Sequence, residues 1–418
     1  MSRLSLNFQS GFESPILIDF KGSRCYELFV LLTIHGVRES MMKDSTATRR
    51  PTVAEVDLRA LSFNYRQIQK RISKRAKILA VVKANAYGHG AVPISLKLEK
   101  LGVEYLGVAI SEEGVELRKG GVKTPILILG GLYGNEIDQV FRYRLTPVVF
   151  QKDSFHLLIE EAERRREKVK IHFKVDTGMG RLGIPTNLWP SFLKEIRQSP
   201  RVEIEGILSH FAMTDEGGTT YTQHQWNEFQ KAIAIAREFG ISFKYLHMAS
   251  SAPLATFPFC SGDLVRPGIM LYGSYPSPMY QNFIQLRPIM TLKTRIHFLK
   301  SVPPGTKISY GGTFLTKRES LIATLPIGYA DGYNRLLSNQ GEVLVRGVRA
   351  PVVGRVCMDF VMVDVTHIPK VTTGDEVVLI GRQGRERISV EEVAEKIGSI
   401  SYEVFCSIGE RVPRLYKE

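Results

Sequence analysis

The sequence predicts an α/β protein in which an N-terminal (β/α)8 barrel of the TIM type is followed by a mainly β C-terminal domain. From about residue 53, short apolar and β-branched runs alternate with amphipathic helical stretches, the pattern of a parallel α/β fold. After about residue 288, strand-like runs follow one another directly and are separated by turn residues. We therefore expect three segments: an N-terminal extension over residues 1–48, the barrel over residues 49–287 and the β domain over residues 288–418.

The first segment, residues 1–48, lacks the periodicity of the rest of the chain. Two methionines, Met41 and Met42, stand close to its end, so our hypothesis is that residues 1–42 are an accessory tail or the product of a start codon assigned too early. The strongly apolar run over residues 28–32 is far shorter than the roughly 20 residues that a helix needs to cross a bilayer. It also begins too late for an ordinary signal peptide. We expect a cytoplasmic protein with no membrane contact.

In the second segment, the apolar runs predict barrel strands and the amphipathic stretches predict helices. The expected strands are residues 78–82, 104–110, 125–129, 169–175, 202–208, 241–247 and 264–272, and the clearest helices are residues 58–72, 154–166 and 222–239. About eight such units favour a closed barrel. A doubly wound open sheet is the alternative, and periodicity alone does not separate the two.

The third segment reads as strands with one helix near its end. The expected strands are residues 291–298, 321–326, 341–345, 350–357, 360–365 and 376–380, and the helix is residues 390–397.

The composition is that of a globular enzyme rather than of a nucleic-acid-binding protein. Hydrophobic residues make up 44% and charged residues 23% of the chain, which is ordinary. The net charge is +14, but the densest basic run, residues 164–166, is surrounded by glutamates and is typical of a solvated helix face. The four cysteines form no C-x-x-C pair and no Cys/His zinc spacing, which favours a reducing compartment. We expect no metal and no nucleic-acid partner.

A barrel places its functional residues just past the C-terminal ends of its strands. Lys83 ends the run over residues 78–82 and is followed by small residues, so it is a candidate amine nucleophile with room for a bulky ligand. Arg181, in a glycine-rich loop, could offer its fork to a carboxylate or a phosphate. Ser251 and the stretch over residues 264–269 offer hydroxyls and glycine amides for a phosphate. An exposed strand-end lysine and ordinary turn chemistry are the structural alternatives.

Taken with others further along the chain, these segments resemble the alanine racemase family. Lys83 stands in a stretch similar to the signature that carries the pyridoxal-phosphate (PLP) lysine in that family. Seven matching stretches occur in the same order, at residues 81–90, 176–183, 265–273, 308–312, 328–333, 357–359 and 402–414. One short motif carries a real risk of coincidence, but these seven cover roughly residues 50–418. Ser250 departs from the pattern, since many members have asparagine there.

The resemblance implies a PLP enzyme that works as a homodimer with shared active sites. Lys83 would hold PLP covalently and act as one base, and Tyr310, supplied by the partner subunit, would be the other. Arg266 would lie at the pyridine nitrogen, and an arginine cannot accept a proton there. His210 would stack on the ring and tune Tyr310 through Arg266. The phosphate would be bound by Tyr87, Ser251, Gly268, Ile269 and Tyr402.

The remaining residues implied by the resemblance surround the substrate. Arg181 and Met358 would meet the substrate carboxylate, while Tyr329 and Asp359 would line the entrance or its surroundings. Lys174 matches a lysine that is carbamylated in some members, where it orients the arginine. Without the family context, His210 and Met358 would be read as ordinary core residues.

The chemistry agrees with these residue types. The Cα proton of free alanine is too weakly acidic for an unaided side chain, and PLP lowers that barrier. Inverting the centre needs a base on each face, and a tyrosine base must be activated by a neighbouring cation. The expected function is interconversion of L-alanine and D-alanine, supplying D-alanine for peptidoglycan.

Three other functions compete with this one. The nearest is a racemase of broader specificity that also accepts serine. A barrel PLP decarboxylase of the ornithine or diaminopimelate type is disfavoured because Tyr310 and Arg266 stand in racemase motifs. A single-domain PLP-carrier protein is disfavoured because it lacks the second domain that carries Tyr310.

Overall fold

The computed structural model describes residues 50–196, 199–214, 219–257 and 262–418, so the expectations for residues 1–48 lie outside the described residues. Eight parallel strands form the first domain in the order β10-β2-β3-β4-β5-β6-β8-β9. They are β2 (Lys77–Val81), β3 (Tyr105–Val108), β4 (Ile126–Ile128), β5 (Thr146–Val149), β6 (Val169–Asp176), β8 (Val202–Leu208), β9 (Tyr245–His247) and β10 (Leu264–Val265).

The two ends of this order meet, which makes a nearly closed barrel of the TIM type. The amide of Asp263 donates to the carbonyl of Leu246 at 2.8 Å, and the amide of Arg266 donates to the carbonyl of Ala249 at 2.8 Å. Ser250 and Arg266 also form a parallel bridge just past the two strands. The predicted barrel is therefore confirmed, and the open doubly wound sheet is wrong.

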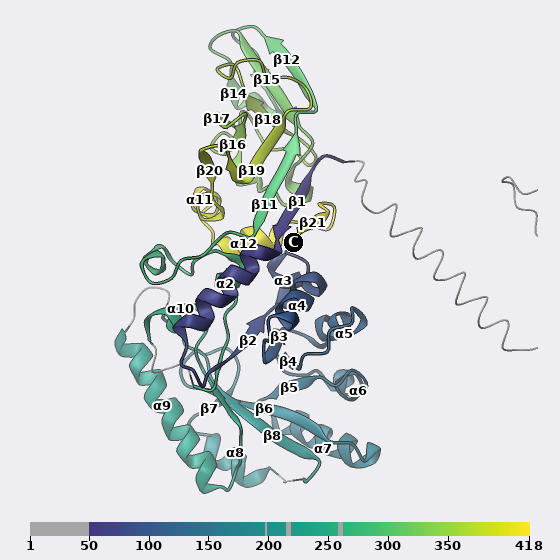
Figure 1. Ribbon diagram of the computed structural model, residues 1–418, viewed down its shortest axis with the longest axis vertical. Coiled ribbons are helices and arrows are strands. Elements are labelled where there is room, and N and C mark those ends of the chain that lie inside the picture. Colours follow the sequence, from purple (N-terminus) through teal and green to yellow (C-terminus); the bar gives the residue numbers. More distant parts are fainter. Residues whose placement is uncertain (1–49, 197–198, 215–218, 258–261) are drawn as a thin grey trace, which may run out of the picture. The chain divides into compact units, whose positions relative to one another are not determined.

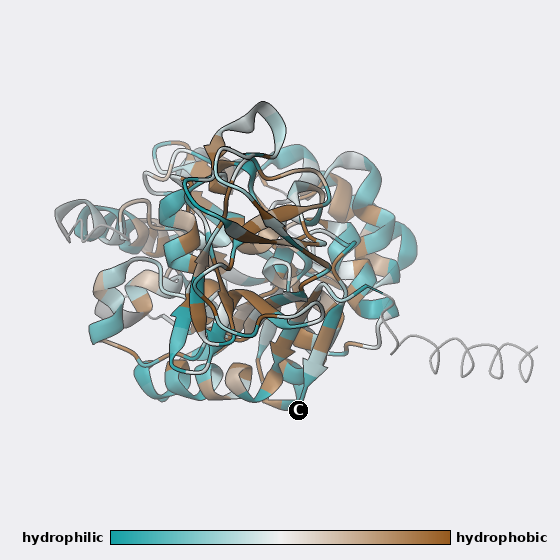
Figure 2. Ribbon diagram, turned by 90° about the horizontal axis from the view of Figure 1, so that it is seen from above, coloured by the Kyte–Doolittle hydropathy of each residue, from teal (hydrophilic) through white to brown (hydrophobic). Residues whose placement is uncertain are grey.

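The barrel strands are apolar because both of their faces are buried. All four residues of β3 and all three of β4 are buried, and the helices at the periphery carry hydrophilic residues on their outer faces (Figure 2). Helices follow the strands along the outside (Figure 1): α4 (Ala91–Lys100), α5 (Ser111–Lys119), α6 (Ile137–Arg142), α7 (Lys152–Arg165), α8 (Trp189–Glu195) and α9 (Thr219–Glu238). Helix α2 (Leu58–Arg71) begins at Asp57, whose carboxylate accepts from the amides of Arg59 and Ala60.

Three barrel strands differ from the sequence prediction. Of the run predicted over residues 241–247, only β9 (Tyr245–His247) is extended. β5 was not predicted, because Pro147 stands within it and proline normally argues against an inner strand. The run over residues 264–272 was predicted as one strand, but only Leu264–Val265 is extended, and a 3-10 helix, η3 (Ile269–Tyr272), follows. Pro267 and Gly268 separate the two, since proline withholds a ladder donor and glycine adopts φ −117° and ψ −94°.

The second domain is built on a mostly antiparallel sheet in the order β17-β16-β19-β11-β1-β21, with β20 paired to β19. Its strands are β17 (Val348–Pro351), β16 (Glu342–Val345), β19 (Glu376–Gln383), β11 (Met290–Arg295), β1 (Val53–Asp57), β21 (Arg414–Lys417) and β20 (Glu386–Ile388). Smaller sheets hold β12 (Phe298–Val302), β15 (Ser320–Leu325) and β18 (Val361–Asp364), and the pair β13 (Lys307–Ile308) and β14 (Phe314–Leu315). This confirms a mainly β C-terminal domain.

Strand β1 comes before the barrel in the sequence but pairs with the second domain. It is antiparallel to β11 and parallel to β21. Its residues lie within the segment 49–287 that was predicted to form the barrel. The sequence of a short apolar strand does not show which sheet the strand will join. The chain therefore passes from the second domain into the barrel between β1 and α2.

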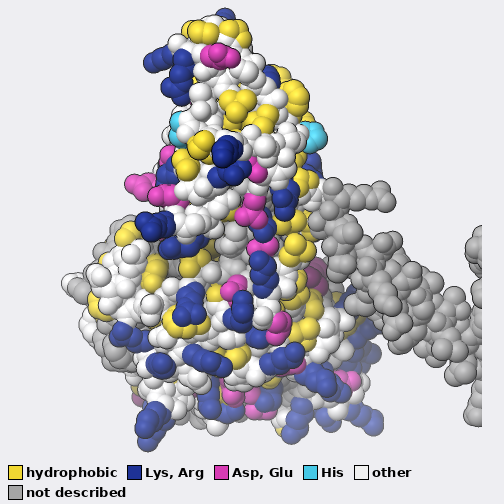
Figure 3. Space-filling model, turned by 45° about the horizontal axis from the view of Figure 1, so that its top comes forward, with side chains coloured by type: hydrophobic (Ala, Val, Ile, Leu, Met, Phe, Trp, Pro, Cys, Tyr) yellow, Lys and Arg dark blue, Asp and Glu magenta, His cyan; other side chains and the backbone are white. Residues whose placement is uncertain are grey.

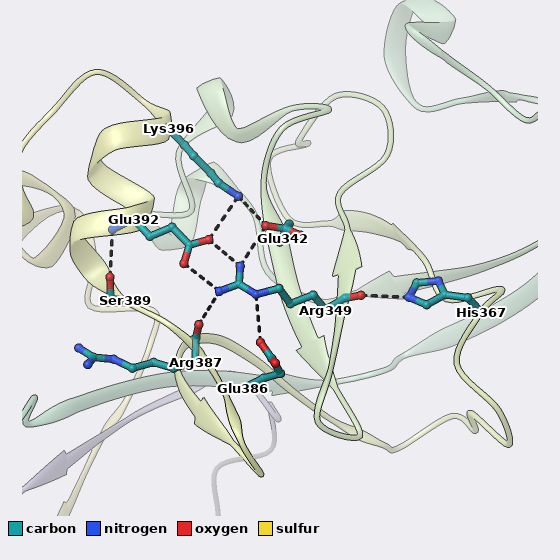
Figure 4. A network of polar contacts seen from close by, with 8 residues as sticks. All are labelled: Glu342, Arg349, His367, Glu386, Arg387, Ser389, Glu392 and Lys396. Carbon is teal, nitrogen blue, oxygen red and sulfur yellow. Dashed lines mark hydrogen bonds and ion pairs between the residues drawn. The ribbon is translucent and has the colours of Figure 1, made fainter.

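A charged network fastens helix α11 (Val390–Lys396) to the second-domain sheet (Figure 4). The guanidinium of Arg349, on β17, donates to Glu342 at 3.0 Å, to Glu392 at 2.7 Å and to Glu386 at 3.3 Å. Lys396 reaches Glu342 at 2.8 Å. Helix α12 (Ser401–Ser407) follows and carries Tyr402. None of the helices in the described part of the chain has the length and hydrophobicity needed to cross a bilayer.

Candidate active site

Lys83 lies directly past the C-terminal end of β2, where the barrel prediction placed it. Its side chain is half-buried. Burial lowers the pKa of its amine, and the neighbouring positive charge of Arg181 lowers it further, while Glu113 acts in the opposite direction. A lowered pKa raises the fraction of neutral amine, which is the nucleophilic form of a lysine.

A left-handed turn follows Lys83. Ala84, Asn85, Ala86 and Tyr87 all have φ of 52°, a region that costs non-glycine residues roughly 1–2 kcal/mol each. The carboxylate of Glu113 accepts from the amide of Ala84 at 2.6 Å and so restrains the turn. Strain of this kind persists only where surrounding contacts enforce it, and it concentrates at functional sites. Glu113, at the start of α5, is thus a site residue that the sequence analysis missed.

The left-handed turn aims Tyr87 at Gly268. A Cβ atom at position 268 would lie 2.5 Å from the Tyr87 hydroxyl oxygen, so only glycine permits this approach. The amide of Gly268 donates to Oγ of Ser251 at 2.9 Å, and the rings of Tyr87 and Tyr402 lie 5.9 Å apart. With Ile269 at the start of η3, these residues form a cradle of hydroxyls and amides past the ends of β2 and β10. Such a cradle suits a phosphate.

Arg266 is buried beside this cradle, with 4% of its surface exposed. Its Nη1 donates to Nδ1 and to the carbonyl oxygen of His247, at 3.0 and 2.8 Å. Its Nη2 donates to the carbonyls of Ser209 and Met248 and to Nδ1 of His210. Within the described ranges no residue accepts from Nε, so that one N–H remains available to a ligand.

Cationic groups gather at the mouth of the barrel. Lys174 is 6% exposed, and its pKa is lowered to about 8 by burial and then by the charges of Arg266 and Arg181, with Asp176 opposing them. Burial and the same arginines hold the pKa of His210 well below its usual range, so that its imidazole stays neutral. A site of this kind favours an anionic ligand.

The second domain carries four further predicted site residues, and a single chain leaves them on its surface. Tyr310 is 71% exposed, Met358 53% and Tyr329 43%, and Asp359 pairs with Arg411 at 2.7 Å. Exposed hydrophobic side chains gather on this domain (Figure 3); they include Phe298, Leu315, Leu336, Met358 and Phe360.

The residue before Tyr310 holds a strained conformation. Ser309 has φ 63° and ψ −175°, a region almost reserved for glycine. Its Oγ donates to the carbonyl of Arg355 at 2.6 Å, which fixes the turn that presents Tyr310 to solvent. The structure therefore brings together the predicted barrel residues and leaves Tyr310 and Met358 outward.

The fold and the site together define a two-domain barrel enzyme with a lysine, a buried arginine and an anion cradle at the barrel mouth. Comparison with known proteins names the family within that class. The profile of the alanine racemase N-terminal domain matches residues 56–276, and that of the alanine racemase C-terminal domain matches residues 289–416. The chain belongs to the alanine racemase family, whose members are isomerases.

Individual relatives agree with this assignment. A protein of Halothermothrix orenii described as an alanine racemase is 48% identical over 368 residues, covering 88% of this chain and 97% of the relative. The structure of alanine racemase from Bacillus anthracis with bound L-Ala-P is 40% identical, covers 89% and 96% of the two chains, and superposes with a TM-score of 0.84. That of alanine racemase from Bartonella henselae with covalently bound pyridoxal phosphate is 30% identical, covers 88% and 99%, and has a TM-score of 0.79.

Proposed function

We propose that the protein interconverts L-alanine and D-alanine with PLP bound at the barrel mouth. The observation that carries the proposal is the convergence of Lys83, the Tyr87–Gly268 contact and Arg266 past the ends of neighbouring strands. The Tyr87 hydroxyl and the Gly268 amide fit a phosphate, and the free Nε of Arg266 fits a ring nitrogen. We further propose a cytoplasmic location and a role in supplying D-alanine for peptidoglycan.

The barrel residues would hold the cofactor and move one proton. Lys83 would bind PLP covalently and act at Cα from one face, helped by its lowered pKa. When bound, PLP supplies the electron sink that makes the Cα proton acidic. Arg266 would face the ring nitrogen and, having no site for a proton, would leave that nitrogen unprotonated. Arg181 would bind the substrate carboxylate.

The second base would come from another copy of the chain. Tyr310 is exposed on the second domain, so we propose a homodimer in which Tyr310 and Met358 of the partner subunit complete each site. Nδ1 of His210 accepts from Arg266 at 3.1 Å. The proton of its neutral ring therefore lies on Nε2, where it can donate to the Tyr310 phenol oxygen of the partner subunit.

The decisive experiment uses the purified protein with PLP and L-alanine in D2O. We expect D-alanine to form with deuterium at Cα, because the hydrogen delivered on the opposite face comes from the second base, whose proton exchanges with solvent. Chiral chromatography and mass spectrometry would follow inversion and exchange together. A result with neither inversion nor exchange would refute the proposal. L-serine is tested in parallel as a second substrate. A racemase of broader specificity would give comparable kcat/KM values for alanine and serine.

Lys174 is expected to carry a carbamate. With a pKa of about 8, roughly one amine in four is neutral at pH 7.5, and a neutral amine can attack carbon dioxide and release a proton. The resulting anion would offset the charges of Arg181 and Arg266. We expect 13C-bicarbonate to give a carbamate NMR signal that is absent in Lys174→Met, and the variant to raise the KM for alanine about tenfold. An unchanged spectrum in Lys174→Met would rule the modification out.

Glu113→Gln is expected to weaken PLP binding about tenfold. The carboxylate accepts from the amides of Ala84 and Ala109, and the amide nitrogen of glutamine would face one of these donors. Losing a hydrogen bond to a charged group costs about 1.5–3 kcal/mol, and 1.4 kcal/mol is a factor of ten. The adjacent, exposed Glu112 provides the control, since Glu112→Gln should bind PLP normally. Equal PLP affinity in the two variants would show that Glu113 does not support the turn.

A further inference from the structure

A line of buried polar side chains runs through the barrel interior away from Arg266. Nε2 of His247 lies 2.8 Å from Nδ1 of His172, and Nε2 of His172 lies 3.5 Å from a carboxylate oxygen of Glu205. His172 and His247 are fully buried, and Glu205 is 3% exposed. These residues come from strands β6, β9 and β8 in turn, and Arg266 follows β10. The Arg266 guanidinium is thus connected to a carboxylate deep in the barrel.

Two backbone features make room for this line. The pairing of β6 with β8 shifts register so that Ile171 faces Ile204 while His172 faces Gly206, which leaves Glu205 as the extra residue of a bulge. A bulge re-aims side chains, and here it lets Glu205 meet Tyr105, which lies on the non-adjacent strand β3. A Cβ atom at position 206 would lie 2.5 Å from Nδ1 of His172, so Gly206 leaves space for the imidazole.

The line has a direction. Arg266 has only protons to offer, so Nδ1 of His247 must be the acceptor and its proton lies on Nε2. That proton points at Nδ1 of His172, which must also be an acceptor, so the proton of His172 lies on Nε2 and faces Glu205. The carboxylate can only accept. It therefore selects the tautomer of both histidines that suits Arg266.

The charges around the line keep it in this state. Burial opposes ionisation of Glu205, but the His172 ring at 3.5 Å and hydrogen bonds from Lys170 and Tyr105 lower its pKa to about 2. Burial lowers the pKa of His172, although Glu205 opposes it, and burial and Arg266 hold the pKa of His247 well below its usual range. Tyr245 packs against His172 as well, and its hydroxyl donates to Glu104. Both imidazoles therefore stay neutral at physiological pH.

We propose that Glu205 is a positioning residue which, through His172 and His247, orients the Arg266 guanidinium so that its free Nε points at the ring nitrogen of the cofactor. The inference rests on the proposed function, because it assigns Arg266 to that nitrogen. If the carboxylate is lost, His172 can put its proton on Nδ1. His247 must then present a proton to Arg266, and two donors face each other.

The test compares Glu205→Gln with Tyr105→Phe. Glutamine offers both a donor and an acceptor and no longer selects one tautomer. Tyr105→Phe removes a hydrogen bond to the same carboxylate oxygen but keeps the ring that packs edge-on against His172. Ring 15N NMR of histidine-labelled apoprotein reports the tautomers. We expect Nδ1 of both histidines unprotonated in the wild type and in Tyr105→Phe, and a mixture in Glu205→Gln. With PLP, Glu205→Gln should lower kcat about tenfold, with KM for alanine changed less than about twofold. Loss of the hydrogen-bond partner of a metal-binding histidine has an effect of about this size.

Two results would overturn the inference: a proton on Nδ1 of His172 in the wild-type apoprotein, or Glu205→Gln matching Tyr105→Phe in both tautomers and kcat. The wild-type spectrum can overturn the inference even if Glu205→Gln does not fold. It also separates this inference from the proposed function, since a wild type that shows the expected tautomers and racemises no alanine would refute only the latter.

Discussion

Lys83→Arg is expected to lower racemisation of alanine by about 10³-fold or more. The guanidinium keeps the positive charge but stays protonated, so it can neither attack the cofactor aldehyde nor exchange a proton at Cα. Loss of a base alone accounts for about 10²–10⁴-fold, and the loss of covalent attachment adds to it. Chiral measurement of D-alanine formation checks the rate, and borohydride reduction followed by peptide mapping checks whether PLP is trapped at position 83.

The matched control for this change is Lys77→Arg. Lys77 begins the same strand, β2, but is exposed at the opposite end of the barrel. We expect its activity and PLP trapping to equal those of the wild type. Wild-type turnover in Lys83→Arg would mean that another residue serves as the base. PLP trapped at a different residue would mean that the cofactor is attached there and not at Lys83.

Tyr310→Phe is expected to lower racemisation by about 10²–10⁴-fold while PLP binding stays unchanged. Phenylalanine keeps the ring but removes the proton-carrying oxygen on one face. Lys83 still serves the other face, so one enantiomer should exchange its α-proton for deuterium without inversion. Tyr133→Phe is the control, because Tyr133 is 69% exposed, close to the 71% of Tyr310, yet lies on the barrel. Equal loss of exchange for both enantiomers in Tyr310→Phe would argue against a separate base on each face.

Mixing two inactive variants tests whether the sites are shared. In a dimer of Lys83→Ala with Tyr310→Phe, one site carries both substitutions and the other carries neither, if Tyr310 comes from the partner subunit. Random exchange makes half of the dimers mixed, so about one quarter of all sites should regain activity. No recovery after exchange that is verified by mass spectrometry would mean that each chain completes its own site.

The sequence predicts those residues of the candidate site that stand in recognisable local motifs. Lys83 follows a buried strand and Arg266 sits in a matched stretch, so a barrel prediction places both at one end. Tyr310 is exposed on the second domain, and its role as a base supplied by the partner subunit stays a prediction. Glu113 could not be singled out, since a glutamate in the first turn of a helix is ordinary capping chemistry and its second partner, Ala84, lies on another element.

The sequence by itself determined the two-domain order, the alternation that makes a barrel and the residue types at its mouth, because hydrophobic periodicity and motif spacing are local properties. Only the tertiary structure decided that β1 joins the second domain, that Pro147 stands in a barrel strand and that a bulge turns Glu205 toward His172. Each of these depends on which strands pair and in which register. Strand pairing depends on contacts between residues far apart in the chain, so a local sequence pattern does not predict it.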